Sequence, residues 1–384
     1  MAQQGFVVSA RKYRPGTFSD VVGQEHVANT LRNALKNHQL GHAFLFTGPR
    51  GVGKTTCARI LAKAINCHNL TPEGDPCNQC DSCRSYNEGR SLNIFELDAA
   101  SNNSVDDIRQ LIDRLRYVPQ GGSKSVYIID EVHMLSTAAF NAFLKTLEEP
   151  PAHALFILAT TEKHKILPTI LSRCQKFDFR RITIADMADR LRHIAEQEGI
   201  SYEYEGLQLI ALKADGALRD GLSIFDQIVN FSGGHLSYQQ VLDNLNILDY
   251  DYFFRVGECM RSGDATQVLL LFDEVIQKGF EAVNFVTGLL EHFRNLLTAQ
   301  EPQTLHLLEV SDNVKQQYAV QSKQLSASTL LNAFNLTAET EFRIRNVSLP
   351  RLTVELLLLK LVHLPQALQV ATLSASVPEG QKKN

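Results

Sequence analysis

The chain has 384 residues, of which 44% are hydrophobic and 21% charged, as is typical of a soluble globular protein of two or three domains. Its formal net charge of −4 neither favours nor excludes a nucleic-acid partner, because an acidic chain can still carry a basic face. The amino terminus lacks the apolar core of a signal peptide, and the longest apolar run, Leu352–Val362, is interrupted by Glu355 and Lys360. We therefore expect a cytoplasmic protein with no membrane partner.

Short apolar runs alternate with helical patterns over residues 1–181. Five runs are rich in β-branched and aromatic residues and continuously apolar, as strands buried on both faces should be. These predicted strands are Ala43–Gly48, Asn93–Asp98, Ser125–Asp130, Leu155–Thr160 and Gln175–Phe179. Helices are predicted over Thr55–Ile65, Val105–Tyr117 and Thr137–Leu147, with Ser104, Asp107 and Ser136 as amino-terminal caps. This alternation predicts an α/β fold with a parallel sheet.

The strand pattern fades after the fifth run. From Ile184 to about Leu245 the apolar spacing predicts helices only, with breaks at "EQEGISYE" and "FSGGHLS". A second all-helical stretch is predicted from about Asp249 to Leu364. Residues 366–384 are poor in bulky apolar side chains, so we expect a linker or a disordered tail there.

The stretch "GPRGVGKT", Gly48–Thr55, fits the pattern G-x-x-x-x-G-K-[ST] between a predicted strand and a predicted helix. Glycines there let backbone N–H groups turn toward phosphate oxygens at the helix amino terminus. Lys54 would reach the β- and γ-phosphates, and the Thr55 hydroxyl would ligate Mg²⁺. The residues predicted to bind ATP are Gly48, Gly51, Gly53, Lys54, Thr55 and Thr56. A chance glycine-rich turn is the alternative, which the strand and helix context disfavours.

The stretch "VYIIDEVH" reads as a buried strand that ends in two carboxylates. We expect this strand to lie beside the phosphate strand, where Asp130 would help hold the magnesium ion. Glu131 would then orient and deprotonate an attacking water. Two acids at a solvated strand end are common, so this interpretation depends on the phosphate loop upstream.

Four of the seven cysteines, Cys67, Cys77, Cys80 and Cys83, form the pattern C-x9-C-x2-C-x2-C. Four thiolates suit a tetrahedral structural zinc ion, which would leave no open position for catalysis. The alternatives are a [4Fe–4S] cluster, which lacks its usual x3-C-P continuation here, disulfides, which need an oxidising compartment, and free thiols. The remaining cysteines, Cys57, Cys174 and Cys259, are expected to be small core residues.

Several stretches resemble the clamp-loader group of AAA+ ATPases, and more closely the tau/gamma subunits of bacterial DNA polymerase III. They are "ARKYRPGTFSDVVGQEHV", "HAFLFTGPRGVGKTT", "ELDAASNNSVDDIRQL" and "FNAFLKTLEEPPAHALFILATT". The similarity runs from about Ser9 to Arg219 and continues as helical pattern alone to about Leu364. It implies an AAA+ core with a parallel five-stranded sheet, a zinc-binding insertion, a helical lid and an all-α collar.

The resemblance also implies roles for single residues. Thr161, with Thr160 as its neighbour, would sense the γ-phosphate, although either could simply cap a strand. Arg173 in "SRC" would reach the ATP site of a neighbouring subunit, with an ordinary surface arginine as the alternative. Arg219 in "GALRDGL" would contact the nucleotide from the lid, unless it only pairs with Asp215 along a helix. The segments "ARKYRP" and "DVVGQ" resemble those that wrap the adenine, which makes Tyr13 and Arg14 candidate contacts.

On this resemblance the domains are a nucleotide-binding core over 1–181 with a zinc module at 66–89, a lid over 182–245, a collar over 246–365, and a tail over 366–384. The nearly continuous apolar stripes of the third region suit an oligomeric collar, with a monomeric helical domain as the alternative. The implied function is an ATPase motor that opens a sliding clamp and loads it onto primed DNA. The implied partners are the beta clamp, the delta and delta prime subunits, further copies of the chain, and primed-template DNA. Nothing after Leu364 resembles the carboxy-terminal domains of the tau form, so the sequence is either a short, gamma-like form or a fragment.

Three rival interpretations remain. Another AAA+ machine, such as a branch-migration motor or an initiator, would be expected to carry a DNA-binding helix-turn-helix after the lid, and we find none in the sequence. A non-hydrolysing scaffold subunit would typically lack the lysine or the glutamate, whereas this chain has both Lys54 and Glu131. A zinc-dependent DNA-binding module would need basic or aromatic flanks around the cysteines.

Overall fold

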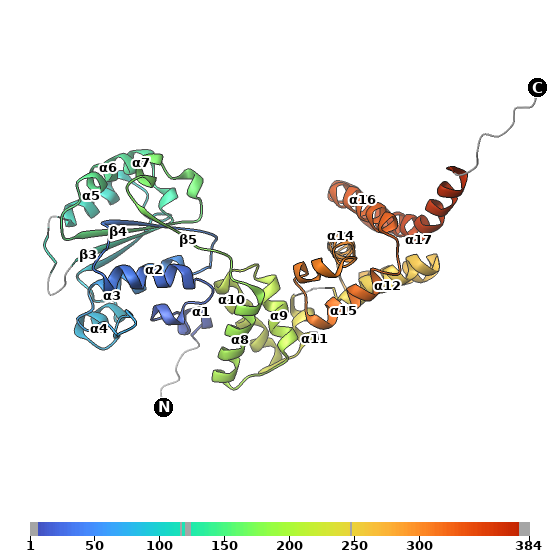
Figure 1. Ribbon diagram of the computed structural model, residues 1–384, viewed down its shortest axis with the longest axis horizontal. Coiled ribbons are helices and arrows are strands. Elements are labelled where there is room, and N and C mark those ends of the chain that lie inside the picture. Colours follow the sequence, from blue (N-terminus) through green and yellow to red (C-terminus); the bar gives the residue numbers. More distant parts are fainter. Residues whose placement is uncertain (1–6, 116, 120–123, 246–247, 376–384) are drawn as a thin grey trace, which may run out of the picture. The chain divides into compact units, whose positions relative to one another are not determined.

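The computed structural model describes residues 7–115, 117–119, 124–245 and 248–375. It divides into two compact units, Met1–Leu236 and Ser237–Asn384 (Figure 1). No helix in the described part of the chain combines the length and the apolarity that a membrane crossing requires.

A five-stranded parallel sheet forms the centre of the first unit, as the sequence predicted. Its strands are β1 (Ala43–Thr47), β2 (Ile94–Asp98), β3 (Ser125–Asp130), β4 (Ala154–Thr160) and β5 (Gln175–Asp178). Their order is β2-β3-β4-β1-β5. The expectation that β3 lies beside the phosphate strand β1 is wrong, because β4 lies between them and pairs with both.

Helices cover both faces of this sheet (Figure 1). One face carries α2 (Glu25–Lys36) and α3 (Lys54–Ile65), and the other carries α5 (Val105–Arg114), α6 (Thr137–Glu148) and α7 (Pro168–Leu171). Side chains alternate between the faces of a strand, so Phe44 and Phe46 join the apolar cluster under α2 and α3. Leu45 joins the opposite cluster. This two-sided burial explains why the strands are continuously apolar.

The predicted helix caps are confirmed. The Ser104 hydroxyl accepts a hydrogen bond from the Asp107 amide, and the Asp107 carboxylate accepts from the Ser104 amide in return. The Ser136 hydroxyl accepts from the Ala139 amide at the start of α6. These bonds satisfy amide donors that the first turn of a helix otherwise leaves free.

The second half of the first unit is mostly helical, with α8 (Ile184–Glu198), α9 (Tyr204–Lys213) and α10 (Leu218–Ser232). The prediction of helices alone in this stretch is wrong in one detail, because β6 (Ser201–Tyr202) and β7 (His235–Leu236) form a short parallel pair. Gly199 and Gly233 end α8 and α10 in the left-handed conformation, which glycine adopts without a steric penalty. The remaining short elements of this unit are α1 (Ser9–Lys12), η1 (Phe18–Asp20), α4 (Asp81–Asn87), η2 (Val132–Met134) and η3 (Lys163–Lys165).

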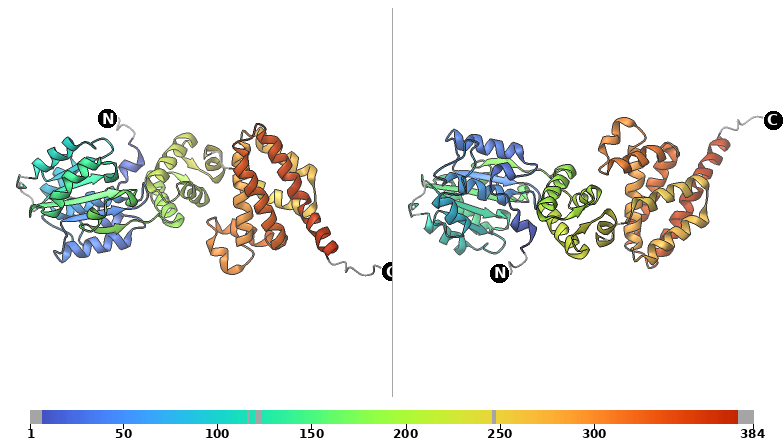
Figure 2. Two further views of the ribbon diagram at one scale, coloured as in Figure 1. Left: turned by 90° about the horizontal axis from the view of Figure 1, so that it is seen from above. Right: turned by 90° about the horizontal axis from the view of Figure 1, so that it is seen from below.

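The described part of the second unit is all-helical, as predicted. Its elements are α11 (Tyr238–Leu245), α12 (Tyr250–Ser262), α13 (Ala265–Gln277), α14 (Ala282–Thr298), η4 (Pro302–Leu307), α15 (Asp312–Gln321), α16 (Ala327–Ile344) and α17 (Pro350–Ala375). Helices α16 and α17 pack along each other (Figure 2). The core of the second unit includes the fully buried rings of Phe272, Phe285 and Phe293, which lie on α13 and α14.

The expectation of a linker or disordered tail from residue 366 is wrong for part of that segment. Helix α17 continues through Pro365 to Ala375, although a proline removes one helical hydrogen bond. The residues after Pro365 include Ala367 and Leu368, which are strong helix formers and favour continuation. Residues 376–384 lie outside the described part of the chain.

Candidate nucleotide and metal sites

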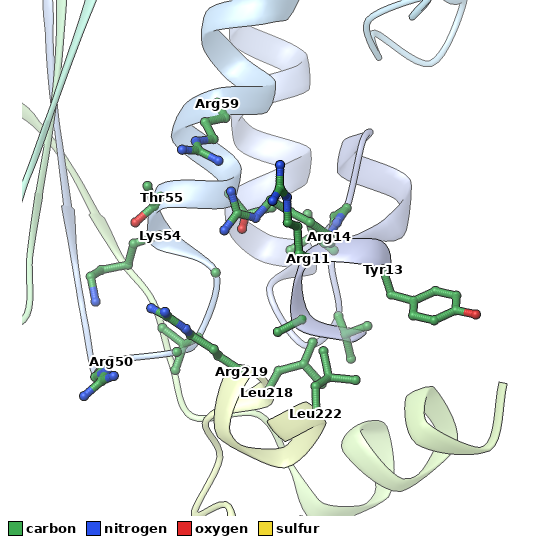
Figure 3. Close-up of a pocket in the computed structure, with 18 of the residues that line it drawn as sticks. Arg11, Tyr13, Arg14, Arg50, Lys54, Thr55, Arg59, Leu218, Arg219 and Leu222 are labelled. Carbon is green, nitrogen blue, oxygen red and sulfur yellow. The ribbon is translucent and has the colours of Figure 1, made fainter. Parts of the chain in front are cut away.

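A cavity of about 600 Å³ opens at the phosphate loop of the first unit. Its walls come from the loop and the start of α3, from the amino-terminal segment, and from the first turn of α10 (Figure 3). Six cationic side chains line it: Arg11, Arg14, Arg50, Lys54, Arg59 and Arg219. Such a concentration of positive charge suits a polyanionic ligand such as a nucleoside triphosphate.

The phosphate loop requires glycine at two positions for steric reasons. Gly48 has a φ of 148°, and a Cβ atom there would lie 2.5 Å from the Phe179 carbonyl oxygen. Gly51 has a φ of 78°, and its Cβ would lie 2.9 Å from the Cβ of Ala217 at the edge of the lid. Both positions combine a left-handed backbone with a close approach, which is the use that glycine has in phosphate-binding loops.

Lys54 is the first residue of α3, and its side chain is buried. Its Nζ donates to the carbonyl oxygens of Gly48, at 2.8 Å, and Pro49, at 2.6 Å. Burial lowers the pKa of Lys54, and the nearby carboxylates of Glu131 and Asp130 oppose that shift. The ammonium group is therefore already held within the phosphate loop.

Thr55, in the first turn of α3, meets Asp130 at the end of β3, although β3 and the phosphate strand β1 are not neighbours. The Thr55 hydroxyl donates to the Asp130 carboxylate at 2.6 Å. A hydroxyl and a carboxylate oxygen beside a phosphate loop are the ligands that Mg²⁺ prefers. The residues present therefore fit a magnesium ion.

Glu131 follows β3 with a φ of 47°, a left-handed conformation that is uncommon for a residue with a side chain. Its carboxylate accepts hydrogen bonds from the Thr161 hydroxyl, at 3.0 Å, and the Thr161 amide, at 3.3 Å. Thr161, which directly follows β4, therefore contacts the carboxylate of the residue that was predicted to be the base. Uncommon backbone conformations of this kind cluster at functional sites, where the surrounding structure maintains them.

His133, for which the sequence predicted no role, lies between these groups with a side chain only 5% exposed. Its Nδ1 is 3.0 Å from the Thr160 hydroxyl and 3.4 Å from Glu131, and its Nε2 is 3.3 Å from Glu162. Only the pairing of β3 with β4 brings these residues together. No local pattern in the sequence could have revealed this contact.

Arg219 reaches toward the phosphate loop from α10 (Figure 3). Its backbone amide also donates to the Gly51 carbonyl at 3.4 Å, so the lid touches the loop directly. The alternative in which Arg219 pairs with Asp215 along a helix finds no support. Asp215 precedes α10 and forms its ion pair with Arg181 instead.

The two candidate adenine contacts behave differently. Both residues line the cavity, but Arg14 points toward Arg11 and Arg59, whereas the Tyr13 ring points away from these side chains (Figure 3). The Tyr13 hydroxyl donates to Glu198 on α8. The apolar part of the wall comes from Val21, Val22, Ile182, Leu218 and Leu222, of which Val21 and Val22 belong to the segment "DVVGQ".

Arg173 lies apart from this cavity. It follows α7, donates to the Thr169 carbonyl at 2.7 Å and forms an ion pair with Glu148 at 2.8 Å. The side chain is 33% exposed. The structure therefore does not place Arg173 with the other predicted site residues of its own chain.

The four clustered cysteines converge just after the carboxyl end of α3. Their Sγ atoms all lie within 4.8 Å of one another, and all seven cysteines of the chain are unbridged. Burial would raise the pKa of the Cys77 thiol, but hydrogen bonds from the Gln79 and Cys80 amides outweigh it and lower that pKa to about 6. A tetrahedral zinc ion about 2.3 Å from each sulfur would be compatible with this arrangement. As predicted, Cys57, Cys174 and Cys259 are buried in the core.

Family models of DNA polymerase III subunits match successive segments of the chain. Residues 23–183 match a family model described as DNA polymerase III, delta subunit, and residues 186–234 match the clamp loader subunit ATPase lid domain. Residues 236–373 match domain III of DNA polymerase III subunits gamma and tau.

Among solved structures, the Thermotoga maritima RuvB Holliday junction branch migration motor has a TM-score of 0.47 and 19% identity, covering 64% of this chain and 78% of RuvB. That likeness is too weak to carry an argument.

Curated relatives give the stronger result. The DNA polymerase III subunit tau of Bacillus subtilis is 40% identical over 91% of this chain and 62% of its own length. The Escherichia coli subunit tau is 46% identical over 72% of this chain, which spans only 43% of that relative. The subunit gamma of Buchnera aphidicola is 36% identical over 82% of this chain and 85% of its own length. The chain therefore belongs to the gamma and tau subunit family of bacterial DNA polymerase III.

Proposed function

We propose that the chain is an ATP-hydrolysing motor subunit of the DNA polymerase III clamp loader, acting in the cytoplasm on replicating DNA. The observation that carries the proposal is the convergence of Lys54, Thr55, Asp130 and Glu131 on one basic cavity at a phosphate loop. Family membership supports the same conclusion. The proposed domains are a core over 1–181, a lid over 182–245 and a collar over 246–365.

In this proposal the phosphate loop amides and Lys54 bind the triphosphate of ATP. Thr55 and Asp130 hold the magnesium ion, which neutralises phosphate charge when bound. Glu131 takes the proton of the attacking water, and Thr161 orients Glu131 and the γ-phosphate. Hydrogen bonds from Thr161 to the Glu131 carboxylate support this positioning. Arg219 contacts the phosphates from the lid, and Arg14 lies among the residues that surround the nucleotide.

Arg173 is proposed to complete the ATP site of a neighbouring subunit. Its place outside the cavity of its own chain and its partly exposed guanidinium support a role in trans. A positive charge supplied between subunits would make hydrolysis depend on assembly. The proposed assembly contains further copies of this chain with the delta and delta prime subunits, and it opens the beta sliding clamp and places it on primed DNA.

The cysteine cluster is proposed to bind a structural zinc ion. Four thiols within reach of one ion, with amide donors to the Cys67 and Cys77 sulfurs, support this assignment. A short insertion can gain from metal the stability that it cannot obtain from a core of its own. We expect Cys80→Ser to lower the zinc content of the purified protein, while Cys259→Ser, outside the cluster, leaves it unchanged. Equal zinc content in both variants would contradict the assignment.

Steady-state ATPase activity tests the main proposal. The chain is measured alone and then with the other loader subunits, the sliding clamp and primed DNA, with Glu131→Gln as the inactive comparison. We expect clamp and primed DNA to stimulate the wild type and the Glu131→Gln variant to lose the activity. An ATPase that ignores clamp and DNA would contradict the loading function. A full assembly without ATPase activity would point to a scaffold subunit instead.

A further inference from the structure

Asp75 lies in the insertion just before Cys77 and is only 4% exposed. Its Oδ1 accepts a hydrogen bond from the Phe18 amide at 2.8 Å. Its Oδ2 accepts from the Ser19 hydroxyl at 2.7 Å and from the Arg32 guanidinium at 2.9 Å. A buried carboxylate with three donors, one of them charged, is a strong and specific contact. It joins the cysteine-bearing insertion to a segment far away in the sequence.

The loop that presents Asp75 is closed on itself and packs against α2. The Asp75 amide donates to the Thr71 hydroxyl at 3.1 Å, and the Thr71 amide donates to the Asp75 carbonyl at 2.9 Å. Gly74 has a φ of 93°, and a Cβ atom there would lie 3.2 Å from the Lys36 side chain. The Asp75 carboxylate is therefore held in place by the turn and by α2.

The segment that Asp75 holds leads directly into the wall of the cavity. Phe18 and Ser19 belong to η1, and Val21 and Val22, which follow it, line the cavity. Pro15, which precedes η1, lines it too. Asp75 thus fixes a short helix between two stretches of cavity wall without touching the cavity itself.

A second set of contacts ties the insertion to the phosphate-loop helix. Lys63, near the carboxyl end of α3, donates to the side-chain oxygens of Asn78 and Asn87. Asn78 also lies against the backbone at Gly16, where a Cβ atom would be 3.9 Å from its Nδ2. The insertion therefore contacts α3 and the segment before η1, and both of these contribute residues to the cavity wall.

We propose that Asp75 couples metal binding at the four cysteines to nucleotide binding in the cavity. A metal ion orders the insertion, the ordered insertion presents Asp75, and Asp75 holds η1 and the adjoining wall in the conformation that fits the nucleotide. Asp75 is a positioning residue, since it touches neither nucleotide nor metal. This coupling rests on the proposed ATP and zinc sites. Because linkage is reciprocal, the nucleotide must raise metal affinity by the same factor.

Equilibrium binding of a fluorescent ATP analogue to the full chain tests the coupling without relying on ATP turnover. Affinity is measured for zinc-loaded and zinc-depleted protein. We expect zinc removal to weaken binding by the wild type roughly 5- to 30-fold, within the usual range for coupled sites. In Asp75→Ala, zinc removal should change affinity less than about twofold, and the zinc-loaded variant should bind like zinc-depleted wild type. Glu73→Ala, an exposed change in the same loop, should behave like the wild type.

Zinc affinity measured with a chromophoric chelator, with and without the analogue, should change by the same factor in the wild type. A wild type whose nucleotide affinity ignores zinc would overturn the coupling, and so would an Asp75→Ala variant that keeps the full dependence on zinc. If Asp75→Ala does not fold, Ser19→Ala, which removes one of the three donors, should show an intermediate dependence, and full dependence there would overturn the role of Asp75. Zinc-loaded wild type that binds no analogue at all would overturn the proposed function as well.

Discussion

The two units use buried polar side chains in different ways. In the first unit Lys54 and Glu131 line a cavity, Glu131 has a left-handed backbone, and His133 lies 3.4 Å from the Glu131 carboxylate. In the second unit His292 is fully enclosed, with Nδ1 3.1 Å from the Tyr318 hydroxyl and Nε2 3.1 Å from the Gln321 side-chain oxygen. The first arrangement places polar groups at a cavity, whereas the second satisfies its polar atoms internally.

Buried polar groups therefore do not by themselves mark a reactive site. Gln321 continues the network in the second unit by donating to the Phe254 carbonyl at 2.7 Å. A satisfied network of this kind makes a core specific and rigid, because a lost partner leaves a buried group uncompensated. A site for chemistry needs polar groups that converge on open space, as the cavity residues do.

Replacing Glu131 with Gln should give the largest effect, because it removes the proposed base while keeping the shape of the side chain. We expect the ATPase rate of the assembled loader to fall roughly 10²- to 10⁴-fold. The free energy of unfolding, measured by urea titration, should stay within about 0.5 kcal/mol of the wild type. Glu205→Gln on the exposed surface of α9 is the control for rate. A much smaller loss of rate would contradict the role of Glu131 as the base, and with it the contrast between a reactive first unit and a purely structural second unit.

Gly51→Ala should act on the structure around the cavity. The left-handed φ and the 2.9 Å approach to the Ala217 Cβ both oppose a side chain there. We expect a loss of about 1–3 kcal/mol in the free energy of unfolding and weaker binding of a fluorescent ATP analogue. Gly89→Ala is the matched control, since Gly89 has a φ of 71° but nothing within 4 Å of its added Cβ. Equal losses of stability in both variants would mean that the left-handed backbone alone, and not the contact with Ala217, opposes a side chain at Gly51.

The internal network of the second unit should make its stability depend on pH. Burial lowers the pKa of His292 from 6.5 to about 3, so the unfolded chain binds a proton that the folded unit does not. The stability that this residue confers is therefore present above pH 6.5 and is lost as pH falls. We expect a loss of about 1.4 kcal/mol between pH 7.5 and pH 5.5.

Chemical unfolding at the two pH values measures this loss, with His292→Gln as the comparison. The variant keeps an amide for hydrogen bonding but cannot titrate, so it should lack this part of the pH dependence. If the free energy of unfolding of the variant depends on pH as that of the wild type does, His292 is not the residue responsible. The buried network of the second unit would then not explain its pH dependence.

Surface ion pairs should give the smallest effects, and similar ones in both units. Arg109 pairs with Asp106 in the first unit, and Arg345 pairs with Glu341 in the second. Solvent screens such pairs, so Arg109→Ala and Arg345→Ala should each change the free energy of unfolding by less than about 0.5 kcal/mol. Thermal unfolding of both variants checks this expectation. A larger change in one variant would mean that surface charge also separates the two units.

Local patterns were sufficient to predict much of the molecule from its sequence. The five strands, the phosphate loop and the caps at Ser104 and Ser136 each depend on residues close together in the chain. The cysteine cluster was predictable for the same reason, because short spacers place thiols near one another. Periodicity and turn chemistry act over a few residues, so they can be recognised without a fold.

Other features depended on contacts between distant segments. Strand order placed β4 between β1 and β3, and it brought His133 against Thr160 and Glu131. Packing of the insertion on α2 buried Asp75 against Phe18. The pair β6 and β7 and the continuation of α17 beyond Pro365 also differed from the sequence prediction. Residues close together in the chain define the local elements and the chemical groups that they carry. Long-range packing selects which of these groups come into contact, because those contacts join residues that no local pattern relates.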